Sequence, residues 1–158
     1  MIADLGLTER VYVLGRVPEE ELDWLYRNAV ALVFPSEYEG FGNPCLEAMS
    51  RGCPVLAASA GALPEVVGDA GLLFPVGDIR AIADGIRLIV TAPETTEEML
   101  SAGHNQASRF TPDVASRQLW AVYCEMLDAT EDRNSGRLSG AQPSESSRQA
   151  KGETHHRP

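Results

Sequence analysis

The sequence predicts an α/β domain, a parallel sheet with helices on both of its faces. Short, almost continuously apolar runs recur along the chain, and most are followed by a segment whose apolar residues have helical spacing. The apolar runs do not alternate with polar residues, which is typical of strands buried on both faces. Strands that alternate with helices favour a doubly wound fold. The 158 residues are 44% hydrophobic, which is sufficient for one domain with its own core.

Four apolar runs are the predicted strands: 11–14 (VYVL), 31–34 (ALVF), 54–58 (PVLAA) and 71–74 (GLLF). Each lacks the polar positions of a solvent-facing strand, so we expect all of them inside the sheet. Sheets of this type usually have about five or six strands. We therefore expect the chain to begin partway through a domain.

The predicted helices follow from the spacing of apolar residues. Segment 18–29 (PEEELDWLYRNA) has acidic residues in its first turn and places Leu22, Leu25 and Tyr26 on one face, which indicates an amphipathic helix with buried packing residues. A short helix or turn is expected at 62–68 (ALPEVVG). Longer helices are predicted for 78–90, 94–110 and 112–129.

The composition changes at about residue 131. Residues 131–158 contain one large aliphatic side chain, Leu138, and are rich in Ser, Gly, Pro and charged residues. Such a segment cannot bury enough apolar surface to offset the entropy lost on ordering, so we expect a disordered tail. The predicted organisation is a domain at 1–130 and a tail at 131–158.

Charge and cysteine content exclude several classes of function. A net charge of −10 argues against nucleic acid or an anionic membrane as a general partner. Cys45, Cys53 and Cys124 have no metal-ligand spacing and no DxD tripeptide occurs, so we expect no metal site and a reduced, cytoplasmic protein. The sequence has no signal peptide and no apolar run of spanning length, which predicts no transmembrane segment and leaves peripheral membrane contact open.

The stretch 35–49 (PSEYEGFGNPCLEAM) joins a predicted strand to a predicted helix and carries the candidate site. Asn43 is suited to cap the helix and Pro44 to occupy its first position. Gly40 and Gly42 allow a sharp turn and a close approach to a ligand. Backbone N–H groups at a helix start bind anions, and parallel sheets bind ligands at the carboxyl ends of their strands.

Two glutamates flank the glycine-bearing loop. Glu39 lies in the loop, and Glu47 lies about one turn into the helix, on the side that leans toward the helix start. A carboxylate is a double acceptor, so the vicinal hydroxyls of a sugar or ribose are its natural bidentate partners. The pattern therefore predicts a site for a diphosphate that joins two hydroxyl-bearing groups. The alternative is that both are ordinary solvated acids.

The string EGFGNPCLEAM (39–49), followed by SRGCPVLAASAGALPEVVGDAGLLFP (50–75), closely resembles the C-terminal domain of glycosyltransferase family 4. The resemblance extends over about residues 2–127. It implies the GT-B fold, which has two Rossmann-like domains, and retaining transfer of a sugar to an unspecified acceptor. A nucleotide-diphosphate sugar is the implied donor and co-substrate, without a further cofactor.

The resemblance also implies a role for each matching position. Glu39 matches the first glutamate of the family's E-x7-E motif, which contacts the donor sugar and carries catalytic importance. Glu47 matches the second glutamate, which binds the ribose hydroxyls. The other implied substrate-binding positions are Arg16 and Val17 beside the base, Leu46 beside the ribose, and Gly40, Phe41, Gly42 and Asn43 at the diphosphate and sugar.

Two features depart from the family pattern. The family stabilises the leaving diphosphate with an arginine and a lysine early in this domain, whereas the only lysine here is Lys151. The acceptor-binding N-terminal domain is also missing from the sequence. We therefore expect the donor-binding half of a glycosyltransferase, a poor catalyst by itself. A non-catalytic nucleotide-binding remnant and an interaction module are the alternatives.

Overall fold

The computed structural model describes residues 1–138, with side-chain surroundings up to residue 129. Contacts within the chain divide it into two compact units, Met1–Val114 and Ala115–Pro158. The described elements are, in chain order, α1 (Glu19–Asn28), β1 (Leu32–Phe34), α2 (Asn43–Ser50), β2 (Val55–Ala58), α3 (Leu63–Val67), the 3-10 helix η1 (Gly68–Ala70), β3 (Leu72–Phe74), α4 (Ile79–Thr91), α5 (Pro93–Ser108) and α6 (Pro112–Leu138). The alternation of strands and helices confirms the predicted α/β class.

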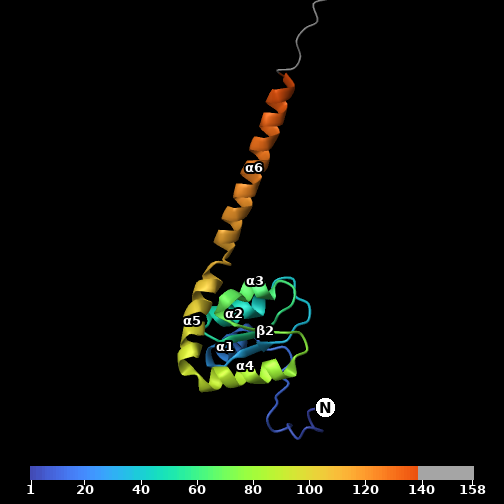
Figure 1. The fold of residues 1–158 in the computed structure, drawn as a ribbon, viewed down its shortest axis with the longest axis vertical. Coiled ribbons are helices and arrows are strands. Elements are labelled where there is room, and N and C mark those ends of the chain that lie inside the picture. Colours follow the sequence, from blue (N-terminus) through green and yellow to red (C-terminus); the bar gives the residue numbers. More distant parts are fainter. Residues whose placement is uncertain (139–158) are drawn as a thin grey trace, which may run out of the picture. The chain divides into compact units, whose positions relative to one another are not determined.

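The three strands form one parallel sheet in the order β1-β2-β3 (Figure 1). Val55 of β2 is in register with Leu32 of β1, and Leu56 is in register with Leu72 of β3. Because the strands are parallel, their carboxyl ends lie along one edge of the sheet. The loops that lead into α2, α3 and α4 all start from this edge.

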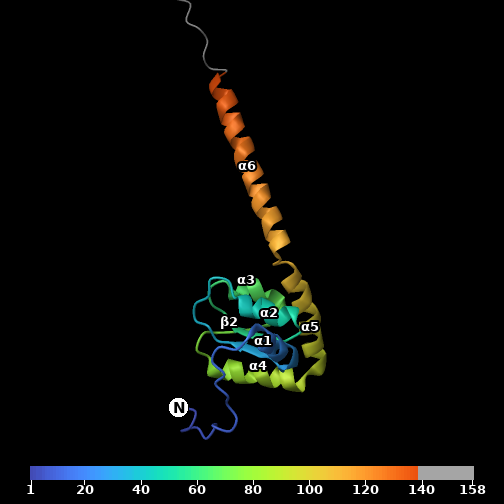
Figure 2. The same ribbon diagram turned by 180° about the vertical axis from the view of Figure 1, so that it is seen from behind.

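Helices cover both faces of the sheet, as the sequence predicts. Val55 and Ala57 of β2 belong to a core that includes residues of α1, α2, α3 and α5, whereas Leu56 and Ala58 belong to a core that includes residues of α4 and α5. Figures 1 and 2 show α2 and α3 on one side of β2 and α4 on the other. All four side chains of β2 are buried, which explains the lack of polar positions in this run.

Local signals fix the start of α4 at the carboxyl edge and its packing on the sheet. The side chain of Asp78 accepts a hydrogen bond from the N–H of Ala81 at 3.0 Å and so caps α4. Within α4, a Cβ at Gly85 would lie 2.7 Å from Cδ1 of Leu56, so glycine permits the helix to pack closely on the sheet. The bounds of α1, α3, α4 and α5 confirm, to within a few residues, the helices predicted at 18–29, 62–68, 78–90 and 94–110.

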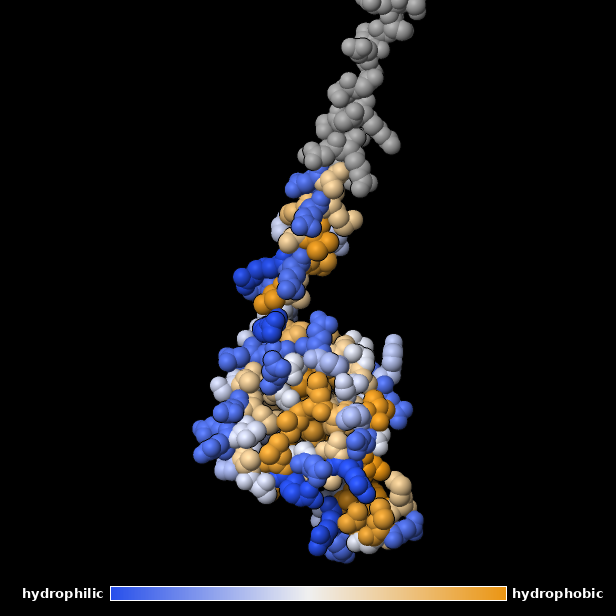
Figure 3. Space-filling model, in the orientation of Figure 1, coloured by the Kyte–Doolittle hydropathy of each residue, from blue (hydrophilic) through white to orange (hydrophobic). Residues whose placement is uncertain are grey.

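The strand predicted at 11–14 is wrong. This segment has no strand pairing, and Tyr12 and Val13 are 77% and 82% exposed. Figure 3 shows hydrophobic side chains, in orange, on the surface of the segment before α1. A strand needs a neighbouring strand for its backbone groups and cover for its side chains, and an apolar composition supplies neither. The described sheet therefore has three strands instead of four.

Helix α6 extends further than the sequence predicts. It begins at Pro112, as expected, but ends at Leu138 and so includes residues 131–138 of the predicted tail. The rest of that tail, 139–158, lies outside the described residues. Along the described chain, no helix has the length and apolar character needed to cross a membrane.

A buried glutamine joins α5 to the end of α3. Gln106 is 9% exposed, and its Nε2 donates to the carbonyl oxygens of Glu65 and Val66 at 3.2 and 3.1 Å. The last carbonyls of a helix have no partner within the helix, so this amide satisfies groups that burial would otherwise leave unpaired. Nη1 of Arg109 donates to Oε1 of the same side chain at 3.1 Å.

Replacing Gln106 by alanine should lower the free energy of unfolding by about 1–3 kcal/mol, because both carbonyls would lose their donor. Asn105→Ala removes an exposed amide one position away on the same helix and should change it by less than about 0.5 kcal/mol. Urea denaturation followed by circular dichroism measures both. Equal effects of the two substitutions would contradict the assigned role.

Candidate functional site

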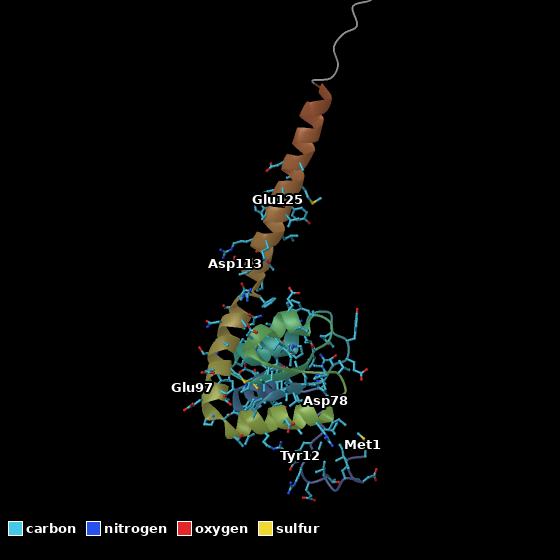
Figure 4. All side chains as sticks on the ribbon, in the orientation of Figure 1. Met1, Tyr12, Asp78, Glu97, Asp113 and Glu125 are labelled. Carbon is cyan, nitrogen blue, oxygen red and sulfur yellow. The ribbon has the colours of Figure 1, made fainter. Side chains whose placement is uncertain are left out.

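The candidate site lies at the carboxyl edge of the sheet. Loop 35–42 follows β1, loop 59–62 follows β2, and loop 75–78 follows β3. Figure 4 shows Asp78, the last residue of the third loop, at the same end of the unit as the other two loops. The edge therefore brings together the stretch that the sequence singles out and a second loop, 59–62, that contacts it.

Helix α2 begins one residue earlier than predicted. Gly42 is its N-cap, with φ 94°, and no side chain caps the helix. A Cβ at Gly42 would lie 2.6 Å from Cδ2 of Leu63, which is fully buried, so both the positive φ and the close contact require glycine. Asn43 is thus the first helical residue, not the cap, and Pro44 is the second. The N–H groups of the first turn have no side-chain acceptor in the described chain.

Gly40 and Phe41 precede the helix in different surroundings. Gly40 is exposed, lies outside the left-handed region, and has nothing within 4 Å of where a Cβ would be. The backbone bends at Gly40, as the sequence predicts, but this bend does not require a left-handed conformation, and the close approach of a ligand stays a prediction. Phe41 is 44% exposed and packs edge-to-face on Phe110, with 5.8 Å between the ring centroids. This contact holds the loop against the chain that follows α5.

Glu39 is held by a contact within its own loop and by contacts from the loop after β2. Oγ of Ser36 donates to Oε2 of Glu39 at 3.2 Å, and the N–H of Ala62 donates to the Glu39 carbonyl oxygen at 3.1 Å. A Cβ at Gly61 would lie 2.3 Å from that same oxygen. Burial and the nearby charge of Glu39 raise the pKa of Cys45 to about 12. Cys45 is therefore a neutral thiol near the carboxylate and does not act as a nucleophile at neutral pH.

Glu47 is held from helix α1. The Tyr26 hydroxyl donates to Oε2 of Glu47 at 3.4 Å. Nη1 of Arg51 donates to the carbonyl oxygen of Glu47 at 3.2 Å, and the guanidinium lies 5.6 Å from the centroid of the Tyr26 ring. Nε of Arg51 is in turn 2.5 Å from Oδ1 of Asp23. Burial and the charge of Glu47 raise the pKa of Tyr26 to about 12, so the hydroxyl is a proton donor at neutral pH.

In the described part of the chain, the remaining predicted site residues make no side-chain hydrogen bond or ion pair with the two glutamates. Leu46 is partly buried on α2, between the two glutamates in sequence. Arg16 is exposed and Val17 partly buried in the loop before α1. The structure therefore gathers 39–47 at one edge but shows no hydrogen bond or ion pair from Arg16 to this loop among the described residues. In the same part of the chain, no three His, Cys, Asp or Glu side chains come together to hold a metal ion.

The sequence interpretation missed the residues that hold the two glutamates. Tyr26 was expected only to pack, because its spacing from Leu22 indicates a buried helical face, and its contact with Glu47 spans 21 positions without a local pattern. Gly61 had only a weak signal, because it lies three positions after the end of β2, outside the strand interior where a glycine marks a close backbone approach. Ser36 had none beyond its nearness in sequence to Glu39.

Comparison with known proteins identifies the family. Residues 1–106 match the family model of the glycosyl transferases group 1. Because this match covers more than half of the chain, the protein belongs to the glycosyl transferases group 1. The curated O-antigen chain mannosyltransferase B of Escherichia coli is 43% identical over 110 residues, which are 70% of this chain and 29% of that protein.

Two solved structures are similar to the chain. The C-terminal domain of the glycosyl transferase group 1 family protein LpcC from Francisella tularensis has a TM-score of 0.61 at 28% identity, over 69% of this chain and 57% of that one. Anabaena HepE in complex with UDP-glucose has a TM-score of 0.69 at 29% identity, over 79% of this chain and 35% of that one. The chain spans only 29% to 31% of the length of the first curated relatives it matches.

Gly61→Ala should displace the Glu39 backbone and destabilise the fold by about 2–5 kcal/mol, because a positive φ and a steric clash both oppose the new methyl group. Gly77→Ala is the matched control: Gly77 also has a positive φ, 77°, but nothing lies within 4 Å of the added Cβ. It should cost only about 1–2 kcal/mol. Thermal unfolding of both variants measures the difference, and equal losses would show that the Glu39 contact is not tight.

Proposed function

We propose that the chain is the donor-binding, C-terminal part of a retaining glycosyltransferase of family 4 with the GT-B fold. The observation that carries this proposal is the position of Glu39 and Glu47 on either side of the uncapped start of α2, at the carboxyl edge of a parallel sheet. Membership of the glycosyl transferases group 1 supports it. So do the likeness to the solved C-terminal domain of LpcC and the UDP-glucose bound by HepE.

In this proposal the ligand is a nucleotide-diphosphate sugar. Its diphosphate lies at the first turn of α2, where backbone N–H groups and the helix dipole favour negative charge. Glu47 accepts hydrogen bonds from the ribose hydroxyls, and Glu39 accepts hydrogen bonds from the donor sugar. The open space around Gly40 fits a close approach of the ligand to the backbone. Arg16 and Val17 are proposed to contact the base, and Leu46 to pack beside the ribose.

The same groups fit the chemistry of sugar transfer. As the bond from the anomeric carbon to the diphosphate breaks, positive charge develops on the sugar ring and negative charge on the leaving group. In this proposal the N–H groups of Gly42 and Asn43 stabilise the leaving group, while the Glu39 carboxylate holds the sugar in a fixed orientation. The acceptor hydroxyl then bonds to the anomeric carbon on the face that the diphosphate leaves, and its proton passes to the departing diphosphate. Attack on this face retains the configuration.

Calorimetric titration of the 158-residue chain with UDP, GDP and ADP, and with their glucose and mannose derivatives, tests this proposal. At least one nucleoside diphosphate should bind, and the attached sugar should change the affinity. Binding of none of these compounds by the folded chain would refute donor binding and favour an interaction module.

Glu47→Ala should weaken binding of the nucleoside diphosphate by about 10- to 100-fold, because hydrogen bonds to a charged acceptor contribute about 1.5–3 kcal/mol. Glu98→Ala removes an exposed acid on α5 and should leave the dissociation constant unchanged. Calorimetry measures both variants. An unchanged affinity in Glu47→Ala would show that the ribose assignment is wrong.

Glu39→Gln should distinguish binding of the sugar from binding of the nucleotide. We expect the affinity for the nucleoside diphosphate to stay within about twofold, and the affinity for the nucleotide sugar to fall by about three- to tenfold, because only the sugar hydroxyls lose their charged acceptor. Glu37→Gln, two positions earlier and exposed in the same loop, is the matched control and should affect neither. An equal loss for both ligands would place Glu39 at the nucleotide instead.

A further inference from the structure

We propose that Tyr26 is a positioning residue for Glu47: from helix α1, its hydroxyl sets the orientation of the carboxylate that recognises ribose. This inference rests on the proposed role of Glu47 in ribose binding. It assigns to α1 a function in ligand recognition, although Tyr26 lies 21 positions before the glutamate that it contacts.

The fold holds Tyr26 far more firmly than it holds Glu47. Tyr26 is 8% exposed and belongs to the core with Cys45, Ala48 and Met49, so packing fixes its ring. A buried hydroxyl requires a partner, and Oε2 of Glu47 is its acceptor at 3.4 Å. Glu47 is only partly buried on the surface of α2, where a glutamate without such a contact samples several rotamers.

A charged pair locks the two helices in this arrangement. Asp23 of α1 binds Nε of Arg51, whose guanidinium lies beside the Tyr26 ring and donates to the backbone carbonyl of Glu47. The side chains of Arg51 and Asp23 are 23% and 35% exposed, so solvent only partly screens the pair. Arg27 also binds Asp23, and both arginines lower the pKa of this carboxyl group. Asp23 therefore remains ionised at neutral pH.

The Tyr26 contact leaves the carboxylate free to bind two hydroxyls. A carboxylate has about four acceptor positions, and the phenol occupies one of those on Oε2. The positions on Oε1 and the second position on Oε2 stay open to vicinal ribose hydroxyls. Arg51 binds the carbonyl of Glu47 and not its carboxylate, so no cation of the described residues is paired with these positions. An ordered carboxylate binds its ligand more tightly because less rotamer entropy is lost on binding.

Tyr26→Phe tests the proposal, since it removes the hydroxyl and keeps the ring in the core. The probes are whichever of UDP, GDP and ADP binds most tightly, and its 2′-deoxy analogue, titrated into the full chain. The variant should weaken the ribonucleotide by about three- to tenfold and the deoxynucleotide by less, so that the ratio of the two constants shrinks. Tyr123→Phe, which removes an exposed hydroxyl on α6, should change neither constant.

A double-mutant cycle separates positioning from a general effect on folding. In a Glu47→Ala background Tyr26→Phe should have no further effect, because the hydroxyl reaches the ligand only through that carboxylate. Asp23→Asn, which leaves both residues in place, should weaken the ribonucleotide by about twofold, and by nothing in the Glu47→Ala background. If Tyr26→Phe does not fold, the Asp23→Asn cycle tests whether α1 positions Glu47.

Additive losses in either cycle, an unchanged ribonucleotide affinity in Tyr26→Phe, or an unchanged ratio of ribo to deoxy affinity would each overturn the positioning role while leaving Glu47 at the ribose. If Glu47→Ala itself binds the ribonucleotide normally, the ribose assignment fails first and the role of Tyr26 fails with it.

Discussion

The parallel pairing of β1 with β2 is the interaction on which the site depends. Because both strands run in the same direction, the loops that follow them leave the sheet side by side. This places Gly61 and Ala62 against the backbone of Glu39, at a distance that no larger residue at position 61 would permit. Burial of β2 on both faces fixes the register of the pair, so the position of Glu39 is ultimately set by the two cores.

The two glutamates are held in similar ways by different parts of the fold. Each carboxylate accepts one hydrogen bond from a hydroxyl: Ser36 donates to Glu39, and Tyr26 donates to Glu47. Neither carboxylate belongs to an ion pair of the described residues. A neutral donor orients a carboxylate without using its charge, so both remain strong acceptors for ligand hydroxyls. This arrangement is the one that the proposed recognition of hydroxyl groups requires.

The sequence predicted what local signals decide and missed what distant contacts decide. The strand, loop and helix around 31–50 are each marked by an apolar run, glycines or an Asn-Pro pair, and all three are present. Asn43 has a good local preference for the N-cap position, but Gly42 is the N-cap. Leu63, about 20 positions later, packs so closely on Gly42 that only glycine fits there, and no local pattern predicts this contact. Segment 11–14 fails as a strand for the same reason, because pairing is a property of the neighbour and not of the segment.

The acidity of the chain is compatible with an anionic ligand because the site acts over short distances. The net charge of −10 is spread over the whole sequence, and at physiological ionic strength exposed charges are screened beyond about 8 Å. A diphosphate at the start of α2 would instead meet backbone N–H groups at hydrogen-bond distance, where the helix dipole is strongest. In the proposed complex the glutamates would meet the uncharged hydroxyls on either side of it. Affinity in such a site comes from the placement of a few donors and acceptors, and that placement is what the packing of α1, α2 and the loop after β2 maintains.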